Sequence, residues 1–225
     1  MEHQSQLMNQ LVFKFPFKVK YYKHDFYVSS NNFSAYKLIE SWPNWPGRWL
    51  NVFGMSGCGK THLSKILEKK ISKTKLIEAK YLDNKIIEEL NEIDCLIIDN
   101  YQNNIDENLF YSILNQSKQL DNYIVVNSIL SLNKMNYNLT DLGSRLNSFL
   151  FIGIKLPNDD LLQVIISKFF SDKQIYLNPK ISEFIIKNVD RSYEKMFKFL
   201  KDIDELSLST GKSININLIK KALNK

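Results

Sequence analysis

Arginine, cysteine and long apolar runs are scarce in this sequence of 225 residues. The two cysteines, Cys58 and Cys95, lack the spacing of zinc ligands, so we expect two reduced thiols in a cytoplasmic protein. No apolar stretch approaches the ~20 residues that a membrane span needs. The polar N-terminus, MEHQSQLMNQ, does not fit a signal peptide. These absences argue against a membrane protein and against a disulfide-rich secreted domain.

The basic charge comes almost entirely from lysine. The formal net charge is +6, yet only three residues are arginines: Arg48, Arg145 and Arg191. The lysines are spread through the predicted helices, which indicates solvated faces, and a working position close to DNA remains the alternative. Because arginine alone offers a planar, permanently charged fork, these three positions are candidates for specific contacts.

Apolar patterning predicts an α/β core followed by a helical segment. Residues 11 to 21 alternate between apolar residues and lysines, which suits an extended segment. Strands are expected at 49–53, 75–79, 94–98, 123–126 and 149–154, and helices at 33–42, 60–72 and 107–120. This alternation implies a parallel sheet covered on both faces. After Pro157 only helices are expected, at about 158–171, 179–189, 192–209 and from 217 onward.

A glycine-rich motif carries the clearest chemical signal. GMSGCGKT fits the pattern G-x-x-x-x-G-K-[ST], with a chance expectation of about 0.3% at these residue frequencies. It consists of Gly54, Met55, Ser56, Gly57, Cys58, Gly59, Lys60 and Thr61, and His62 follows it. A strand precedes the motif and a helix follows it, so backbone N–H groups are expected to surround phosphates at the helix N-terminus. Lys60 would reach the β- and γ-phosphates and Thr61 would hold Mg²⁺. A mere strand-to-helix turn is the alternative.

The stretch LIIDN, residues 96 to 100, suits the second strand of the same site. Asp99 would bind Mg²⁺ directly or through water. Its alternative role is that of a strand-end cap. A second acid would be expected where Asn100 stands, and an amide cannot take a proton as a carboxylate does. We therefore expect weak or absent intrinsic ATP hydrolysis.

These motifs, with DLGSRL at 141–146 and the helical tail, resemble the AAA+ module of the bacterial replication initiator DnaA. The chain is more similar to the Hda type, the short DnaA homologues that switch the initiator off. Asp-Asn at 99–100 and the clamp-motif-like Gln10-Leu11-Val12-Phe13 favour that type, and the sequence ends at Lys225 without an expected helix-turn-helix domain. The resemblance implies three segments. Residues 1–22 would be an extended clamp-binding segment, 23–156 the P-loop AAA+ core with a parallel sheet covered by helices, and 157–225 a small all-helical lid.

The resemblance also assigns roles to individual residues. It implies that Asn127 or Ser128 senses the γ-phosphate and that Arg145 is the arginine finger. Phe26 to Asn32 would pack on adenine. An ungapped match puts Glu194, rather than an arginine, on the second sensor, and Arg191 lies about one helical turn earlier. The assignment of Arg145 has an alternative, because this residue could instead pair with a nearby acid such as Asp141.

The clamp motif is the other assignment with an alternative. The residues Gln10, Leu11, Phe13 and Phe15 suit a segment that binds the sliding clamp, the β subunit of DNA polymerase III. The same residues also suit an ordinary amphipathic strand.

The resemblance implies a regulator that binds ATP or ADP with Mg²⁺ and docks on the DNA-loaded clamp. It would stimulate ATP hydrolysis by the initiator DnaA and so prevent re-initiation, touching DNA through the clamp. Self-association is left open. One alternative is a loader or adaptor that anchors another replication factor without provoking hydrolysis. The other is an autonomous P-loop NTPase or small-molecule kinase.

Overall fold

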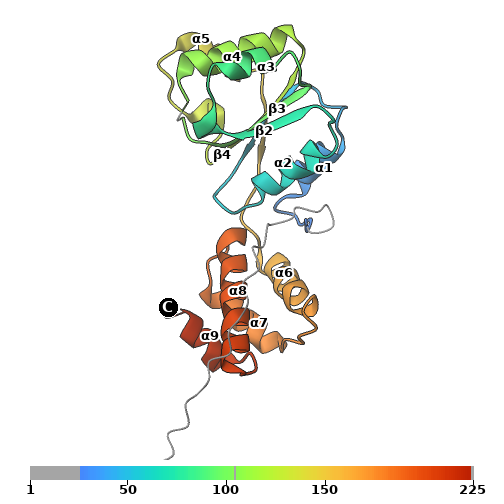
Figure 1. Ribbon diagram of the computed structural model, residues 1–225, viewed down its shortest axis with the longest axis vertical. Helices are drawn as coiled ribbons and strands as arrows, with labels where there is room; N and C mark the ends of the chain where they lie inside the picture. The colour runs from blue at the N-terminus through green and yellow to red at the C-terminus, as the bar shows by residue number, and fades with distance from the viewer. Residues whose placement is uncertain (1–25, 104, 224–225) are drawn as a thin grey trace, which may run out of the picture. The chain divides into compact units, whose positions relative to one another are not determined.

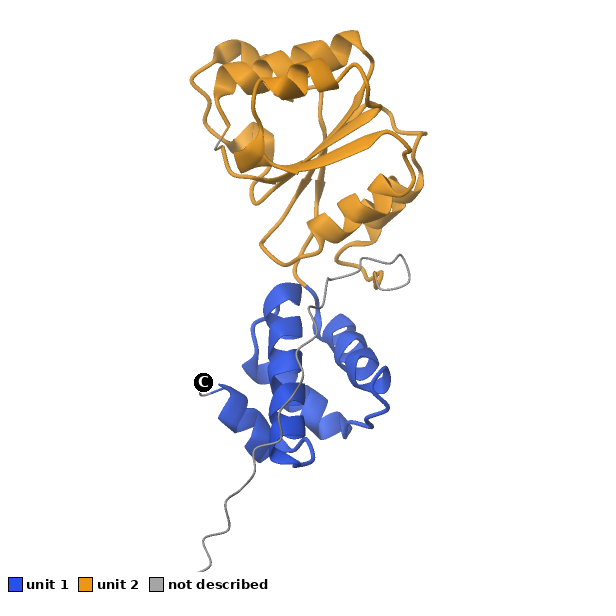
Figure 2. Cartoon of the chain, in the orientation of Figure 1, with its two compact units in different colours: residues 1–20, 157–225 blue, residues 21–156 orange. Residues whose placement is uncertain are grey.

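The computed structural model describes residues 26–103 and 105–223. The described chain divides between Leu156 and Pro157 into two compact units, which are treated one at a time (Figure 2). The predicted clamp motif, with Gln10, Leu11, Phe13 and Phe15, lies outside the described residues. Among those described, no helix combines the length and apolarity that crossing a membrane would require.

The first unit is built on a sheet of five parallel strands in the order β2-β3-β4-β1-β5. The strands are β1 Trp49–Phe53, β2 Thr74–Glu78, β3 Cys95–Tyr101, β4 Tyr123–Ser128 and β5 Leu150–Gly153. The predicted parallel sheet is thereby confirmed. The strand β4 lies between β3 and β1, so the carboxyl ends of these three strands meet at one edge of the sheet, where open α/β folds bind ligands.

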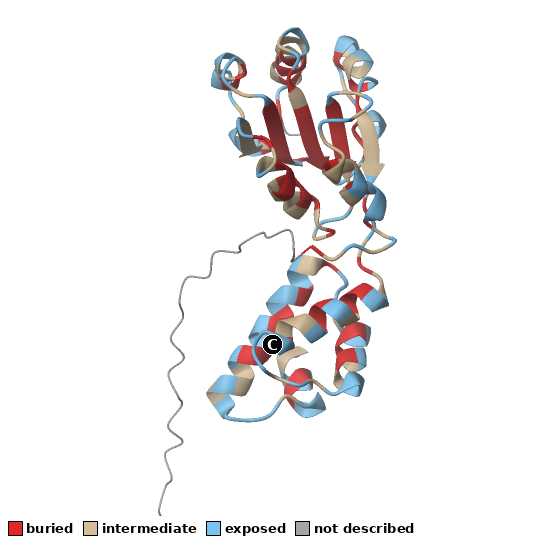
Figure 3. Ribbon diagram, turned by 90° about the vertical axis from the view of Figure 1, so that its right-hand side faces the viewer, coloured by how far each residue is buried: buried red, intermediate tan, exposed pale blue. Residues whose placement is uncertain are grey.

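Helices cover both faces of this sheet (Figure 1). On one face lie α1 Phe33–Glu40 and α2 Lys60–Glu68, and on the other lie α3 Lys85–Glu89, α4 Glu107–Gln119 and α5 Thr140–Leu146. Two short 3₁₀ turns, η2 Ala79–Tyr81 and η3 Leu132–Lys134, complete the connections. Burial on both faces explains the nearly continuous apolar run of β3, whose residues 95–99 are all buried (Figure 3).

The second unit is all-helical, as predicted. It consists of α6 Asp159–Ser171, α7 Pro179–Asn188, α8 Tyr193–Thr210 and α9 Ile216–Leu223. The side chains of Asn158, Asn178 and Ser192 accept hydrogen bonds from backbone N–H groups at the starts of the first three helices. Gly211, with φ 64°, ends α8 in the left-handed conformation that glycine adopts readily.

Two helices of the sheet unit do not appear in the sequence pattern: α3 and α5. Both are short, and neither has a side-chain hydrogen bond from its N-cap residue. The predicted helix from Lys60 to about residue 72 also ends earlier than expected, at Glu68. Local capping and periodicity, on which the sequence prediction relied, are weak in these places.

Candidate nucleotide-binding site

The glycine-rich loop joins β1 to α2 with a backbone that its glycines make possible. Gly54, Gly57 and Gly59 have φ angles of 156°, 72° and 104°. A Cβ atom on Gly54 would lie 2.3 Å from the carbonyl oxygen of Ile154, so no other residue fits there. Because the loop leads directly into the N-terminus of α2 at Lys60, its N–H groups can converge on an anion.

Lys60 is held inside the loop that it follows. Its Nζ donates to the carbonyl oxygens of Gly54 at 2.6 Å and Met55 at 3.1 Å, and it also lies 3.9 Å from the Sγ of Cys58. The side chain is buried, whereas Met55 and Ser56 at the loop tip are exposed. A buried cation beside the N–H groups of a glycine-rich loop suits a phosphate site.

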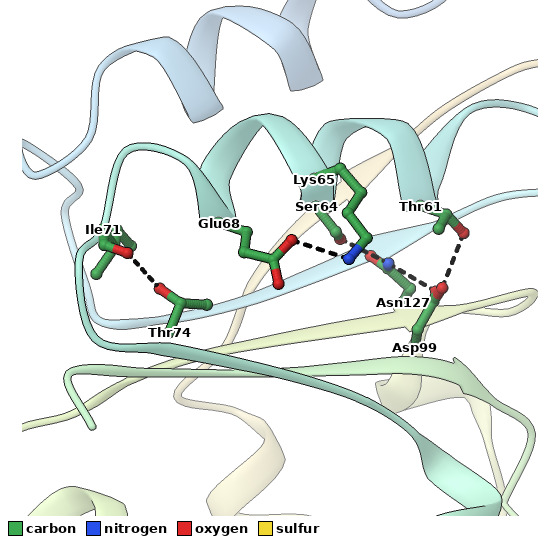
Figure 4. A network of polar contacts seen from close by, with 8 residues as sticks. All are labelled: Thr61, Ser64, Lys65, Glu68, Ile71, Thr74, Asp99 and Asn127. Carbon is green, nitrogen blue, oxygen red and sulfur yellow. Dashed lines mark hydrogen bonds and ion pairs between the residues drawn. The ribbon is translucent and has the colours of Figure 1, made fainter. Parts of the chain in front are cut away.

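A buried carboxylate near the carboxyl end of β3 joins the first turn of α2 to β4. Asp99 accepts a hydrogen bond from the Thr61 hydroxyl at 2.8 Å and another from the Asn127 side-chain amide at 2.8 Å (Figure 4). Asp99 is 4% exposed and Asn127 is fully buried. The carboxylate and the hydroxyl, as oxygen groups, form a donor set that suits a hard cation such as Mg²⁺.

The two candidate sensors behave differently. Asn127 lies beside Asp99, and its Nδ2 also donates to the hydroxyl of Ser64 on α2 at 2.7 Å. Its Oδ1 is buried and has no partner among the described residues. Ser128 donates to the carbonyl oxygen of Leu130 and accepts from Asn51, so its hydroxyl is already used elsewhere. Of the pair, only Asn127 contacts Asp99.

Asn100 has an unusual backbone conformation. Its φ is 56°, a left-handed value that asparagine tolerates better than most residues, and the β3–β4 register shifts between Ile98 and Tyr101. Its N–H donates to Asp99 Oδ1 at 3.1 Å, and its side chain is exposed. An amide therefore stands directly beside the site, at the position where a second carboxylate was expected.

The segment assigned to adenine is tied to the core beside the loop. Phe26 is buried, stacks on Tyr36 with 5.6 Å between ring centroids and meets the edge of His62 at 5.2 Å. The Asn32 side chain accepts from the N–H of Ser29 and donates to the carbonyl oxygen of Tyr27. These contacts shape a turn next to α2, which carries His62.

Cys58, in the middle of the loop, is a packing residue. It is 1% exposed, and burial raises the pKa of its thiol, while the nearby Lys60 acts in the opposite direction with a smaller effect. The thiol is therefore neutral at pH 7 and is not a nucleophile.

Arg145 lies in the last turn of α5, on the face of the sheet opposite the glycine-rich loop's helix α2. Within residues 26–103 and 105–223 its guanidinium makes no hydrogen bond or ion pair, and the alternative partner Asp141 does not contact it. Together with Asn115, Lys118 and Gln119 of α4 it lines a hollow of about 510 Å³. Arg145 is thus half-buried, and its guanidinium has no hydrogen-bonding or ion-pair partner among the described residues.

The other two arginines are paired. Arg48 lies 2.5 Å from Asp121 and 4.8 Å from the ring centroid of Tyr123. Arg191, in the helical unit, lies 2.5 Å from Asp159 at the start of α6. These pairs are half-exposed and give each residue a structural role, so Arg191 would have to leave Asp159 in order to bind a phosphate.

Three polar residues that hold parts of the sheet unit together were missed by the sequence reasoning. Ser64 holds Asn127, as described above. Asn51, fully buried in β1, donates to Val126 and Ser128 of β4 and accepts from the N–H of Leu132 at the start of η3. An asparagine in the middle of the apolar run WLNVF was the available signal for it. Glu107 accepts from Asn138 and Leu139 and gave no local signal.

The geometry fits a nucleoside phosphate with Mg²⁺. The loop leaves no room for a Cβ at Gly54, Thr61 and Asp99 supply oxygen groups, and Asn127 keeps one buried acceptor atom without a partner. No cluster of three or more histidine, cysteine, aspartate or glutamate residues occurs in the described ranges, so a metal held by many protein ligands is not indicated there. A single carboxylate and a hydroxyl leave coordination positions for phosphate oxygens and water, as Mg²⁺ prefers.

A five-stranded parallel sheet with this glycine-rich loop after β1, followed in the chain by a helical unit, has the fold of a P-loop AAA+ module. No protein-family model matches the chain. The chain is 26% identical over 235 residues to the chromosomal replication initiator protein DnaA of Buchnera aphidicola subsp. Cinara cedri. The matched region covers 92% of this chain and 53% of that protein. It therefore spans about half the length of this curated relative.

Solved structures show the same fold. Domain III of DnaA from Thermotoga maritima matches with a TM-score of 0.77 and 20% identity, over 93% of this chain and 98% of that one. AMPPCP-bound DnaA from Aquifex aeolicus matches with a TM-score of 0.69 and 19% identity, over 86% and 68% of the two chains. The chain therefore has the fold of DnaA domain III, and its sequence is similar to that of a DnaA protein.

Proposed function

We propose that the chain is an Hda-type regulator of chromosomal replication initiation. It binds an adenine nucleotide with Mg²⁺, docks on the DNA-loaded sliding clamp and stimulates ATP hydrolysis by the initiator DnaA, which prevents re-initiation. The observation that carries this proposal is Arg145. Of the three arginines it alone has no partner among the described residues, and it lies on the side of the sheet away from the helix of the chain's own glycine-rich loop.

The nucleotide occupies the loop between β1 and α2. The glycine-rich loop and Lys60 hold its phosphates, Thr61 and Asp99 hold Mg²⁺, and the turn containing Phe26 and Asn32 flanks the adenine. Mg²⁺, when bound, neutralises negative charge on the phosphates. The AMPPCP-bound DnaA of Aquifex aeolicus supports this assignment through its similar fold.

The chain's own site is poor at hydrolysis. Asp99 is committed to Thr61 and Asn127, and the neighbouring Asn100 is an amide, which cannot accept a proton from water. The bound nucleotide then acts mainly as a structural ligand that keeps the loop, β3 and β4 together.

Arg145 serves the nucleotide of a neighbour. The transition state of γ-phosphoryl transfer spreads negative charge over its oxygens, and a guanidinium can contact two of them at once. Arginine fingers supplied in trans are worth about 10³ to 10⁵ in rate. An arginine without an internal partner needs to break no ion pair before it inserts, which distinguishes Arg145 from Arg48 and Arg191.

The remaining parts of the proposal concern segments and partners. The segment with Gln10, Leu11, Phe13 and Phe15 binds the clamp, so contact with DNA is indirect. Residues 157–225 act as the lid of the nucleotide site, and Arg191 contacts the phosphates when it leaves Asp159. The protein works in the cytoplasm.

The test combines clamp-loaded DNA, ATP-bound DnaA and this chain, and follows the conversion of ATP to ADP on DnaA. Arg145→Ala and Arg145→Lys should both lose stimulation, because lysine is a compact point charge that cannot make the forked contact. Both variants should bind ADP and the clamp as the parent chain does. Arg48→Ala is the matched control, since it removes an arginine of the same unit that is already paired, and it should stimulate normally.

Two outcomes would contradict the proposal. If either Arg145 variant stimulates like the parent, Arg145 is a structural arginine and Arg191 becomes the next candidate for the finger. If the parent binds clamp and DnaA but leaves hydrolysis unchanged, the chain is an adaptor rather than a stimulator.

A further inference from the structure

The helix that carries Arg145 lacks a cap of its own. The short helix α5 spans Thr140–Leu146, and its N-cap residue is Leu139, whose side chain has no hydrogen-bonding atom. The first N–H groups of a helix have no partner inside the helix and usually need a side-chain oxygen nearby. Here a carboxylate from another helix binds the N–H groups of Asn138 and Leu139, the two residues that precede α5.

Glu107 supplies the missing acceptors from the first turn of α4. Its Oε2 accepts from the N–H of Leu139 at 2.7 Å, and its Oε1 accepts from the N–H of Asn138 at 3.1 Å and from the Asn138 side chain at 3.4 Å. A carboxylate in the first turn also interacts favourably with the positive end of the α4 dipole. The Glu107 side chain therefore accepts hydrogen bonds from the N–H groups just before α5 and also stabilises the start of α4.

The rest of α5 is held mainly through its buried side. Leu142 and Leu146 are fully buried in the core on this face of the sheet, while Gly143 has nothing within 4 Å of a hypothetical Cβ atom. Two buried leucines hold this helix of seven residues against the core. The bonds from Glu107 fix the start of the helix, and thereby the direction in which Arg145 at its other end projects.

We infer that Glu107 is the positioning residue for Arg145. It acts through the start of α5 and touches no phosphate itself. The catalytic consequence rests on the proposed function of Arg145, but the effect on α5 does not.

The first measurement is amide hydrogen exchange, compared between the full-length chain and Glu107→Ala, Glu107→Gln and Glu88→Ala. Glu107→Ala should speed exchange at Asn138, Leu139 and along α5 by about tenfold or more, because charge-assisted bonds are lost. Glu107→Gln keeps one acceptor oxygen and should lie between Ala and the parent. Glu88→Ala removes an exposed acid on α3 whose carboxylate makes no hydrogen bond or ion pair within the described residues, and it should change nothing. Unchanged exchange in Glu107→Ala overturns the inference.

The second measurement uses the hydrolysis assay described above. Glu107→Ala should lower the maximal stimulated rate about tenfold and leave the half-saturating concentration unchanged, because a misdirected guanidinium affects the transition state rather than docking. Glu107→Gln should recover part of the rate. If α5 loosens and the maximal rate stays at the parent's value, Glu107 is only a cap and the positioning role is refuted.

A third measurement separates this inference from the proposed function. The chain has three arginines, so a ¹⁵N spectrum of arginine Nε atoms contains three side-chain signals. Glu107→Ala should shift or broaden the Arg145 signal and leave those of the ion-paired Arg48 and Arg191 unchanged. A parent chain without stimulating activity would refute the proposed function. The spectrum would still test the positioning role of Glu107, because an unaltered Arg145 signal in Glu107→Ala would overturn it.

Discussion

Replacing Asn100 with aspartate tests how much of the weak hydrolysis expected here comes from one missing acid. The backbone should tolerate the change, because φ at this residue is 56° and aspartate, like asparagine, adopts that conformation. The side chain is exposed, and its backbone N–H donates to Asp99, so the new carboxylate would be in contact with water one residue from the proposed metal-binding group.

The expected gain follows from general base catalysis. A well-placed base contributes about 10²- to 10⁴-fold to a rate. The rate gain should be smaller than the upper part of this range. Asn100 is exposed to solvent, and no other described residue forms a hydrogen bond that would orient a carboxylate there. We expect an increase of about ten- to a hundredfold, which corresponds to about 1.4–2.7 kcal/mol of barrier.

The assay is single-turnover hydrolysis of ATP by the purified chain, without clamp or DnaA. Asn103→Asp is the matched control, because Asn103 has the same φ of 56° and the same change of charge but bonds to Tyr101 and Asn136 instead of Asp99. Equal rates for the two variants would refute the reasoning. So would a turnover of about 1 s⁻¹ or more by the unaltered chain, which is within the usual range of enzymes.

Three further predictions concern the clamp motif, the loop and the thiols. A triple variant with alanine in place of Gln10, Leu11 and Phe13 should lose clamp binding in surface plasmon resonance. The same variant should keep nucleotide binding. Gly54→Ala should abolish binding of a fluorescent ADP analogue, because the added Cβ would meet a carbonyl oxygen at 2.3 Å, whereas Gly143→Ala should keep binding and stabilise the chain by about 0.5–1 kcal/mol in urea titrations. Burial raises the pKa of Cys95 to about 12 and also raises that of Cys58, so neither thiol should react with a disulfide reagent at pH 8 unless the protein unfolds. Because folding raises the pKa of Cys95, the neutral thiol contributes its full stabilisation below the unfolded pKa of 9.0, and this stabilisation is lost as the pH rises toward 12. Between pH 9 and pH 12 the free energy of unfolding of Cys95→Ala should therefore fall less than that of the parent chain.

The sequence predicted the parts of the fold whose signals are local. The strand WLNVF was expected at the residues where β1 lies, and the helices of the second unit begin at the predicted caps and prolines. The juxtaposition of the glycine-rich loop with Asp99 also followed from the motif, because parallel strands present their carboxyl ends at one edge.

The features that the sequence did not predict depend on distant residues. The start of α5 relies on a carboxylate from α4, more than thirty residues earlier in the chain, so no local capping signal precedes it. Ser64 and Asn51 support the site only after β4 is in place, and one sequence without aligned homologues cannot show this pairing.

The strand order has a consequence for when the proposed nucleotide could bind during synthesis. Although β1 and the glycine-rich loop emerge early, β1 pairs with β4 and β5, so its first strand neighbour arrives only with residues 124–128. Pairing across such a sequence separation is slow, because the entropy of closing a long loop must be overcome first. A nascent chain that has exposed GMSGCGKT but not β4 contains the phosphate loop without its supporting strand. Nucleotide capture should therefore coincide with completion of the sheet, so that the ligand binds to the assembled unit rather than to its first half.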